Sequence, residues 1–90
     1  MTPEERTALE QIRRAGRLRE IRYTRHARER MNERGVSDAD VQKALASAGH
    51  IRPGDGPGRW RVVGYGADRR QLAVVVALER GAIVITVHDA

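Results

Sequence analysis

The sequence contains no cysteine and no phenylalanine, and aromatic residues make up only 3% of its 90 positions. The absence of cysteine excludes disulfides, a thiol nucleophile and zinc sites with cysteine ligands. Without phenylalanine, the hydrophobic core must consist mainly of Val, Ile, Leu and Ala side chains. A chain of this length forms a single domain, residues 1–90, and buries only about 60–65% of the surface that the unfolded chain exposes. We therefore expect a thin core, which a bound partner would stabilise further.

Long hydrophobic segments are also absent. The longest apolar run, Leu72–Leu78, is far too short to cross a membrane. Residues 1–14 are rich in charge and lack the apolar segment of a secretory signal peptide. These features, together with the lack of cysteine, fit a reducing compartment. We expect a cytoplasmic protein that does not bind a membrane.

Lysine is nearly absent. Sixteen of the seventeen basic residues are arginine, the exception is Lys43, and twelve acidic residues leave a formal net charge of +5. This excess of positive charge raises the local concentration of phosphate groups around the protein. The preference for arginine has two explanations, which the composition leaves open. One is the codon usage of a GC-rich genome, and the other is the ability of guanidinium to bind phosphate through two hydrogen bonds while it stays charged.

The first helix is predicted from its capping signals. Thr2 and Glu5 have the spacing of a capping box, Pro3 suits the first turn, and Gly16 marks the end. Because its apolar stripe is weak, we expect residues 1–17 to form an appended helix that packs lightly or becomes ordered only on a partner. The core of the domain is then residues 18–90. The stripe consists of Ala8, Leu9, Ile12 and Ala15.

The rest of the chain predicts one strand, two helices and three further strands. Thr24 and Ser37 cap the helices, and Gly35 and Gly49 end them. Residues 50–58, rich in glycine and proline, predict a loop. The strands are expected at residues 20–23, 59–65, 71–78 and 82–88, and the helices at 25–34 and between Ser37 and Gly49.

The strand patterns indicate how the sheet is built. The continuous apolar run at 71–78 is typical of a central strand covered on both faces. Arg80 and Gly81 predict a tight hairpin turn before the last strand. Helices followed by strands joined in hairpins indicate an α+β fold, with the helices packed on one face of an antiparallel sheet. By alternation, the last strand places Ile83, Ile85 and Val87 on one side and Val84, Thr86 and His88 on the other.

The helix capped by Thr24 carries the residues with the clearest chemical potential. His26, Arg30 and Arg34 lie one helical turn apart and form a ridge. The apolar residues of the same helix lie beside this ridge, so the ridge borders the buried stripe. Its side chains can therefore reach over the sheet edge, where Arg61 and His88 could meet them.

A histidine surrounded by arginines can cleave RNA. A base removes the proton from a ribose 2′-OH, the alkoxide attacks the adjacent phosphate, and an acid protonates the departing 5′-oxygen. Histidine can serve as base or acid near neutral pH, and arginine stabilises the charge that accumulates on the phosphate. Paired carboxylates at metal-ligand spacing and a His-x-x-x-His pattern are both absent, so we expect no metal and no other cofactor. The predicted catalytic residues are His26, Arg30, Arg34, Arg61 and His88, and the predicted RNA contacts are Arg25, Arg28, Arg59 and Tyr65.

The same residues allow other interpretations. His26 stands near a helix start, where histidines commonly cap the helix or lie on the surface. His88 can belong to a frayed chain end, and Tyr65 can serve only in hairpin packing. Arg30 and Arg34 can brace the two helices by pairing with Glu29, Glu33, Asp38 or Asp40.

The pattern T-x-H-A-x-x-R-M-x-x-R-x-V-S-x-x-D-V runs from Thr24 to Val41 and resembles the signature of a family of small bacterial proteins of unknown function. That family is similar to the RelE/BrnT-type toxins of toxin–antitoxin systems. The final strand fits as well, so the resemblance covers residues 18–88. It implies a RelE-like fold, in which two or three N-terminal helices pack on a small curved antiparallel sheet whose open face receives RNA.

The resemblance also implies a function. It points to the toxin of a type II toxin–antitoxin system, a metal-independent endoribonuclease that acts on RNA, in particular mRNA. The partners would be RNA and a cognate antitoxin, in a homodimer or a toxin–antitoxin hetero-oligomer. His26, Arg30 and Arg34 fall on the signature, whereas Arg61 and His88 rest on geometry alone. Two alternatives stay open: a non-catalytic nucleic-acid- or protein-binding module that uses the same basic face, and a toxin fold that has lost its activity.

Overall fold

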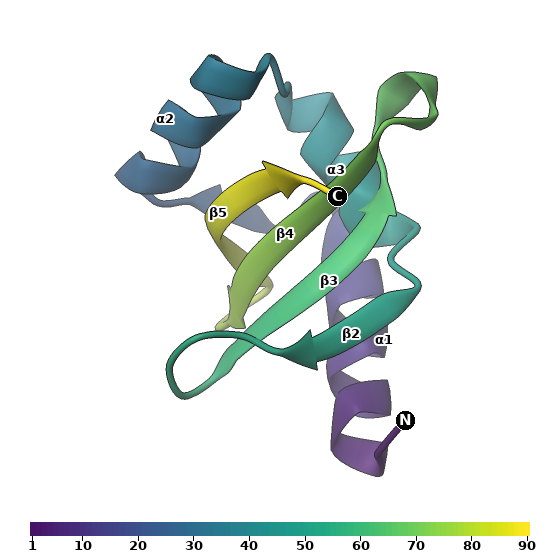
Figure 1. Ribbon diagram of the computed structural model, residues 1–90. Helices are drawn as coiled ribbons and strands as arrows, with labels where there is room; N and C mark the ends of the chain where they lie inside the picture. The colour runs from purple at the N-terminus through teal and green to yellow at the C-terminus, as the bar shows by residue number, and fades with distance from the viewer.

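The computed structural model describes all 90 residues and shows three helices and five strands (Figure 1), which confirms the predicted α+β class. No helix combines the length and the apolar character needed to cross a membrane. The helices are α1 (Pro3–Leu18), α2 (Arg25–Arg34) and α3 (Asp38–Ala46). The strands are β1 (Ile21–Tyr23), β2 (His50–Pro53), β3 (Arg59–Tyr65), β4 (Gln71–Leu78) and β5 (Ala82–Asp89), and a 3₁₀ turn, η1, covers Ala67–Arg69.

The five strands form one sheet in the order β1-β5-β4-β3-β2. The neighbours from β2 to β5 are antiparallel, whereas β1 pairs with β5 in parallel. The prediction of a wholly antiparallel sheet is therefore wrong, because the first short strand joins the far edge of the meander. A parallel pair needs a long crossover connection, and the chain that runs through α2, α3 and the other strands provides it.

Strand β2 was predicted to be part of a loop. It pairs with β3, with His50 opposite Val63 and Pro53 opposite Trp60. Its sequence gives a weak strand signal because β2 is an edge strand, and no residue of it is fully buried. Proline is tolerated at such an edge, where its missing N–H costs no ladder hydrogen bond.

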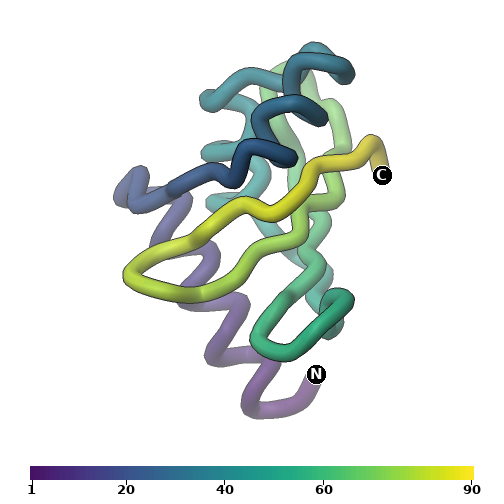
Figure 2. The backbone as a smooth tube through the Cα atoms, turned by 90° about the vertical axis from the view of Figure 1, so that its left-hand side faces the viewer, coloured from purple at the N-terminus to yellow at the C-terminus, as the bar shows by residue number.

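Helix α1 belongs to the core. The sequence predicted instead an appended helix that packs only lightly on a core formed by residues 18–90. Helix α1 packs along α3 on the side of the sheet that faces away from the C-terminus (Figures 1 and 2). Leu9 and Ile12 are buried, and Ile12 has no exposed surface. Gly16 does not end the helix, which continues to Leu18 and closes at Arg19 in the left-handed conformation. A side chain at Gly16 would collide with the backbone of Ala46, so this glycine allows the close approach of α1 and α3.

Helices α2 and α3 start where the capping residues predict. The hydroxyl oxygens of Thr24 and Ser37 accept backbone hydrogen bonds at the two N-termini, and Gly35 ends α2 with a positive φ. Helix α3 ends at Ser47, two residues before the predicted Gly49. The Ser47 hydroxyl accepts a hydrogen bond of 2.9 Å from the backbone N–H of Tyr65 and so fixes α3 to the end of β3.

The core is aliphatic, as the composition predicts. No polar or charged residue is buried, and no aromatic side chain is fully buried. The largest fully buried side chains come from one face of the sheet and from the two helices that cover it. They are Ile12, Val41, Leu45, Val62, Leu72, Val74, Val76, Val84 and Val87.

A β-bulge in β5 changes the predicted alternation of this strand. Thr86 pairs with Val75, but the next residue of β4, Val76, pairs with Val84, so that Ile85 is left without a partner. Val84 and Val87 consequently both face the core. The prediction that Thr86 and His88 share a face with Val84 is wrong, because the extra residue moves them to the opposite face.

The sheet has one covered and one open face. Figure 2 shows α1 and α3 on one side of the sheet, with the β2–β3 loop and the C-terminus projecting on the other. The predicted central strand β4 lies in the middle, but the helices cover only one of its faces. Val74 and Val76 are fully buried on that face, whereas Val75 on the open face is partly exposed. The open face therefore remains accessible to a ligand.

Candidate nucleic-acid interface

Helix α2 is fixed against β5 at the bulge. The Thr24 backbone N–H donates to the carbonyl of Val84 at 3.0 Å, and its hydroxyl donates to the carbonyl of Ile85 at 3.2 Å. The same hydroxyl oxygen accepts from the N–H of Ala27 at 3.0 Å and caps the helix. With Ala27 and Met31 buried against the sheet, the ridge of α2 runs along the edge of β5.

The other four predicted catalytic residues lie near enough to His88 to influence its pKa. Burial and the nearby positive charges of Arg34, Arg61, Arg30 and His26, in this order, lower the pKa of the His88 imidazole. These residues come from α2, β3 and β5, which are far apart in the sequence. The convergence depends on the β5 bulge, because His88 reaches the open face only through the shift that the bulge introduces. A neutral imidazole beside several guanidinium groups can accept a proton at neutral pH.

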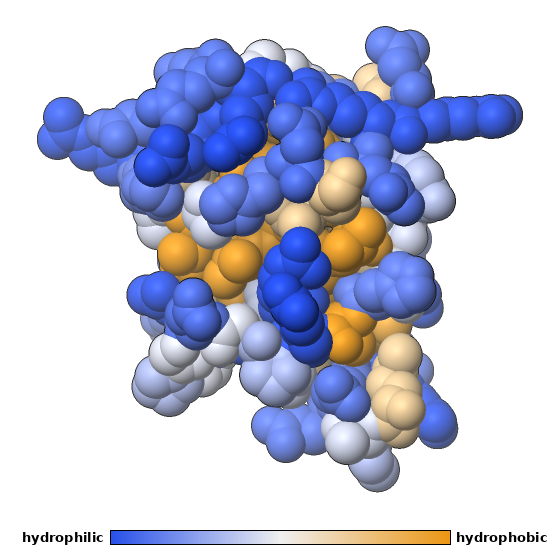
Figure 3. Space-filling view, viewed as in Figure 1, coloured by the Kyte–Doolittle hydropathy of each residue, from blue (hydrophilic) through white to orange (hydrophobic).

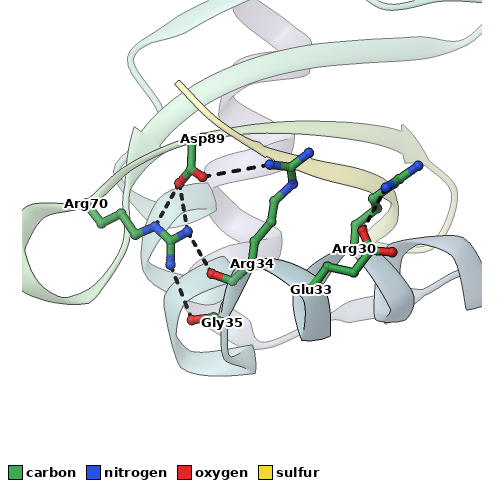
Figure 4. A network of polar contacts seen from close by, with 6 residues as sticks. All are labelled: Arg30, Glu33, Arg34, Gly35, Arg70 and Asp89. Carbon is green, nitrogen blue, oxygen red and sulfur yellow. Dashed lines mark hydrogen bonds and ion pairs between the residues drawn. The ribbon is translucent and has the colours of Figure 1, made fainter.

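The arginines of the ridge are held by carboxylates (Figure 4). Arg30 pairs with Glu33 at 2.7 Å, as one of the bracing alternatives anticipates. Arg34 Nη1 lies 3.9 Å from a carboxylate oxygen of Asp89, a partner that the sequence did not predict. Because the carboxylates are exposed and the arginines are partly exposed, each ion pair contributes little to stability.

Arg70 anchors this network from the other side. It binds Asp89 at 2.8 Å and donates to the backbone carbonyls of Arg34 at 2.8 Å and Gly35 at 3.3 Å (Figure 4). The end of β5 is thus tied to the end of α2, which keeps His88 close to the ridge. The other carboxylates considered as partners of Arg30 and Arg34 are engaged elsewhere. Glu29 pairs with Arg25 and Asp38 with Arg28, while Asp40 caps α3.

Two buried polar atoms of the site have no hydrogen-bond partner in the chain. They are Nε of Arg34 and the hydroxyl oxygen of Thr86. Buried polar groups are almost always satisfied in folded proteins. Both atoms belong to segments that border His88.

The predicted RNA contacts divide into two groups. Arg59 and Tyr65 belong to the same face of β3 as Arg61, because they are separated from it by even numbers of residues. Arg28 lies 4.0 Å above the ring of Tyr23 and pairs with Asp38, so its guanidinium is engaged away from the ridge. Arg25 is exposed and pairs with Glu29 at 3.4 Å. Only the first group shares the open face.

A hollow of about 360 Å³ lies on the open face beside His88 and is lined by residues of β2, β3, β4 and β5 and of the β2–β3 loop. Arg61 and His88 are two of its side chains, and Arg52 is a third, which the sequence did not predict because β2 was expected to be loop. The alternation of polar and apolar residues at 50–53, directly before a glycine-rich turn, is the signal that could have identified it. Figure 3, which has the orientation of Figure 1, shows apolar surface on both sides of a hydrophilic column, below a strongly hydrophilic rim.

The structure contains no group of three or more His, Cys, Asp or Glu side chains positioned to hold a metal ion. Besides the single carboxylate of Asp55, the charged and titratable groups that line the hollow of the open face are the imidazole of His88 and the guanidinium groups of Arg52 and Arg61. These groups bind anions, and phosphate is the anion whose geometry guanidinium matches best.

Comparison with known proteins finds no matching curated protein and no matching solved structure. One family model matches, that of a domain of unknown function (DUF4258), over residues 23–89. The match contains α2, α3, all of the strands from β2 to β5 and every residue around His88, and it leaves α1 outside. Because the match covers most of the sequence and the entire candidate site, the chain belongs to the DUF4258 family.

Proposed function

We propose that this protein is a metal-independent endoribonuclease, and that it is the toxin of a type II toxin–antitoxin pair with a fold similar to that of RelE-type toxins. The observation that carries the proposal is the position of His88, which shares the hollow on the open face with Arg61 and lies near enough to Arg34, Arg30 and His26 for their charges to lower its pKa. General-base and phosphate-stabilising groups are what cleavage at a ribose 2′-OH requires.

The proposed mechanism assigns roles to both histidines and to two of the arginines. Neutral His88 takes the proton of the 2′-OH, and the 2′-oxygen then attacks the adjacent phosphorus. Arg61 and Arg34 stabilise the additional negative charge in the transition state. The bond from phosphorus to the 5′-oxygen breaks, and protonated His26 supplies the proton that this oxygen needs. The products are a 2′,3′-cyclic phosphate and a 5′-hydroxyl, and no water is consumed in this step.

The charge of the chain supports the proposed partners. A net charge of +5 and an open face lined by arginines attract RNA through its phosphates. The same potential would attract an acidic antitoxin, which could inhibit the enzyme by occupying the open face. An inhibitor that competes with the substrate would explain how a cell tolerates the activity.

The test is cleavage of a labelled oligoribonucleotide by purified protein in the presence of EDTA. We expect a 2′,3′-cyclic phosphate product, and we expect no cleavage of a substrate with 2′-deoxy sugars. His88→Gln and Arg61→Gln should each lower the rate by about 100-fold or more. Arg6→Gln, which removes one positive charge at an exposed position of α1, should leave the rate unchanged. Thermal unfolding of every variant shows whether a loss of activity reflects a loss of fold.

A second experiment tests the toxin role in cells. Tightly controlled expression should arrest growth and degrade RNA, and His88→Gln should do neither while it accumulates to the same level. Normal growth with the wild-type protein, together with intact RNA in the purified assay, would refute the catalytic proposal.

One observation favours the alternative of a non-catalytic binding module. Within the chain, no hydrogen bond orients the ring of His26 or of His88, whereas catalytic histidines are usually held by a partner. If the protein is only a binding module, His88→Gln should leave RNA binding intact. Loss of the arginines on the open face should weaken RNA binding. Binding without cleavage would support the alternative.

A further inference from the structure

Arg52 and Arg61 lie directly opposite each other on neighbouring strands, Arg52 on β2 and Arg61 on β3. Directly opposed residues point to the same face with their Cβ atoms about 5 Å apart, and like charges at this distance repel each other. None of the five ion pairs in the structure involves either residue. The chain therefore places two arginines without an ion-pair partner on the same face of neighbouring strands, an arrangement that an anion bound between them would stabilise.

The two arginines share the hollow on the open face with His88. One acidic residue, Asp55 in the β2–β3 loop, also lines this hollow. It forms no ion pair with either arginine, so the cationic groups outnumber the anionic one. A volume of about 360 Å³ falls in the range of small ligand pockets and accommodates a phosphate with part of its nucleotide.

The position of this cluster relative to the ridge of α2 gives it a separate role. Strand β2 is three strands away from β5, and His88 lies two residues beyond Thr86, the residue of β5 in line with Arg52, which corresponds to about 16 Å between the backbones of Arg52 and His88. Arg30 and Arg34 approach His88 from the opposite side, over the edge of β5. An extended strand that crosses the sheet would therefore present one phosphate to His88 and the ridge, and a later phosphate to Arg52.

We propose that Arg52 forms a second phosphate subsite, which binds a phosphodiester of the single-stranded RNA substrate beyond the one that faces His88, with Arg61 lying between the two phosphates. The identity of the ligand as RNA rests on the proposed function, whereas the subsite itself rests on the pairing of the two arginines in the hollow. Arg52 is thus a substrate-binding residue that takes no part in bond cleavage. Its contact is made with the backbone and carries no sequence information.

The test measures binding of a random-sequence 12-mer with 2′-O-methyl sugars, which the proposed mechanism cannot cleave. Arg52→Gln should weaken binding roughly three- to tenfold and reduce the slope of log K against log salt by about 0.7, the value for one phosphate contact on a single strand. Asp55→Asn should tighten binding, because it removes a negative charge from the hollow. Arg6→Gln on α1 is the matched control and should change neither quantity.

A dinucleoside monophosphate separates the two subsites, since it has a single phosphate. Its binding, followed by NMR at His88, should be the same in the wild type and in Arg52→Gln. An unchanged salt slope for the 12-mer in Arg52→Gln would refute the subsite. The subsite would also be refuted if Arg52→Gln weakened binding of poly-glutamate but not binding of the 12-mer. That result would favour an acidic protein as the ligand.

These results distinguish the subsite from the enzymatic proposal. If the 12-mer binds with the expected dependence on Arg52 but unmodified RNA is not cleaved, the subsite stands and the endoribonuclease assignment fails. If unmodified RNA is cleaved while Arg52→Gln binds like the wild type, the enzyme stands and the subsite fails. If the wild type binds no 12-mer even at low salt, both are refuted.

Discussion

The charge of Arg34, on α2, reaches the imidazole of His88, on β5, and after burial it is the largest influence on the pKa of His88. The relationship requires α2 to lie along β5, which Thr24 secures at one end and Arg70 at the other. Arg34 and His88 also lie within the matched family domain, residues 23–89. The pair therefore provides a direct way to test the geometry of the site.

The first prediction concerns the pKa of His88. We expect Arg34→Gln to raise this pKa toward the ordinary value of 6.5 without reaching it, because burial, the larger cause, remains. Titration of the imidazole by NMR measures the shift, with Arg6→Gln as a control of equal charge. An identical His88 titration in Arg34→Gln and the wild type would show that the two side chains do not interact.

The same lowered pKa makes stability depend on pH. The unfolded chain binds a proton at His88 near pH 6.5, whereas the folded chain binds it only at a lower pH. The free energy of unfolding should therefore rise with pH, from below the folded pKa up to about 6.5, and gain nothing further from His88 above this value. Urea denaturation across this range should show a weaker pH dependence in His88→Gln than in the wild type.

Asp40 should govern stability at a lower pH. Its carboxylate accepts hydrogen bonds from the N–H groups of Ser37 at 2.9 Å and Ala67 at 2.8 Å, and the bond from Ser37 is the main cause of its lowered pKa. The stabilisation is complete above the ordinary value of 3.8 and is lost as the pH falls through the folded pKa. We expect Asp40→Asn to cost about 1 kcal/mol at neutral pH and to flatten the acid side of the stability profile. Equal acid sensitivity of the variant and the wild type would contradict this assignment.

Gly64 should be the glycine that tolerates substitution least. A methyl group at this position would collide with the backbone carbonyl of Ala44 in α3, which packs directly on β3. Gly64→Ala should therefore cost about 3 kcal/mol or more, since neither backbone can easily move. Gly35→Ala, where φ is +63° but the space is open, should cost only about 1–2 kcal/mol. Chemical denaturation of both variants checks the order, and a smaller effect at Gly64 would show that α3 can shift away from the sheet.

Helix α1 should be required for stability. Ile12 has no exposed surface and packs into the same core as the strands. Ile12→Ala should cost about 2–5 kcal/mol, a large part of the stability of a domain of this size. A chain that lacks residues 1–17 should not fold cooperatively. Cooperative unfolding of residues 18–90 with unchanged stability would restore the view of α1 as an appended helix.

Local sequence signals located most of the elements correctly. Thr2, Thr24 and Ser37 cap the three helices as predicted, because capping depends on the residue itself and its near neighbours. The strands that alternate clearly or are continuously apolar were also found. Strand β2 was missed, because an edge strand of four residues with little burial shows only a short polar and apolar alternation beside strong loop signals.

The candidate site was only partly predictable. The ridge of His26, Arg30 and Arg34 follows from helical spacing alone. The proximity of Arg61 and His88 was inferred from an expected sheet edge, and in the structure both line the hollow on the open face, with His88 next to the ridge. Arg52, Asp89 and Arg70 were not predicted, since their positions depend on strand pairing and on contacts between distant segments.

The sequence by itself determined the aliphatic core, the N-terminal boundaries of the helices at their capping residues, the α+β class and the arginine-rich ridge of α2, because each depends on composition or on neighbours a few residues apart. Tertiary structure decided the rest. The parallel pairing of β1 with β5, the close approach of α1 to α3 at Gly16 and the bulge at Ile85 all arise from packing between distant segments. The bulge matters most for the site, because one unpaired residue reverses the side of the sheet on which His88 lies, and no local pattern in the strand reveals it.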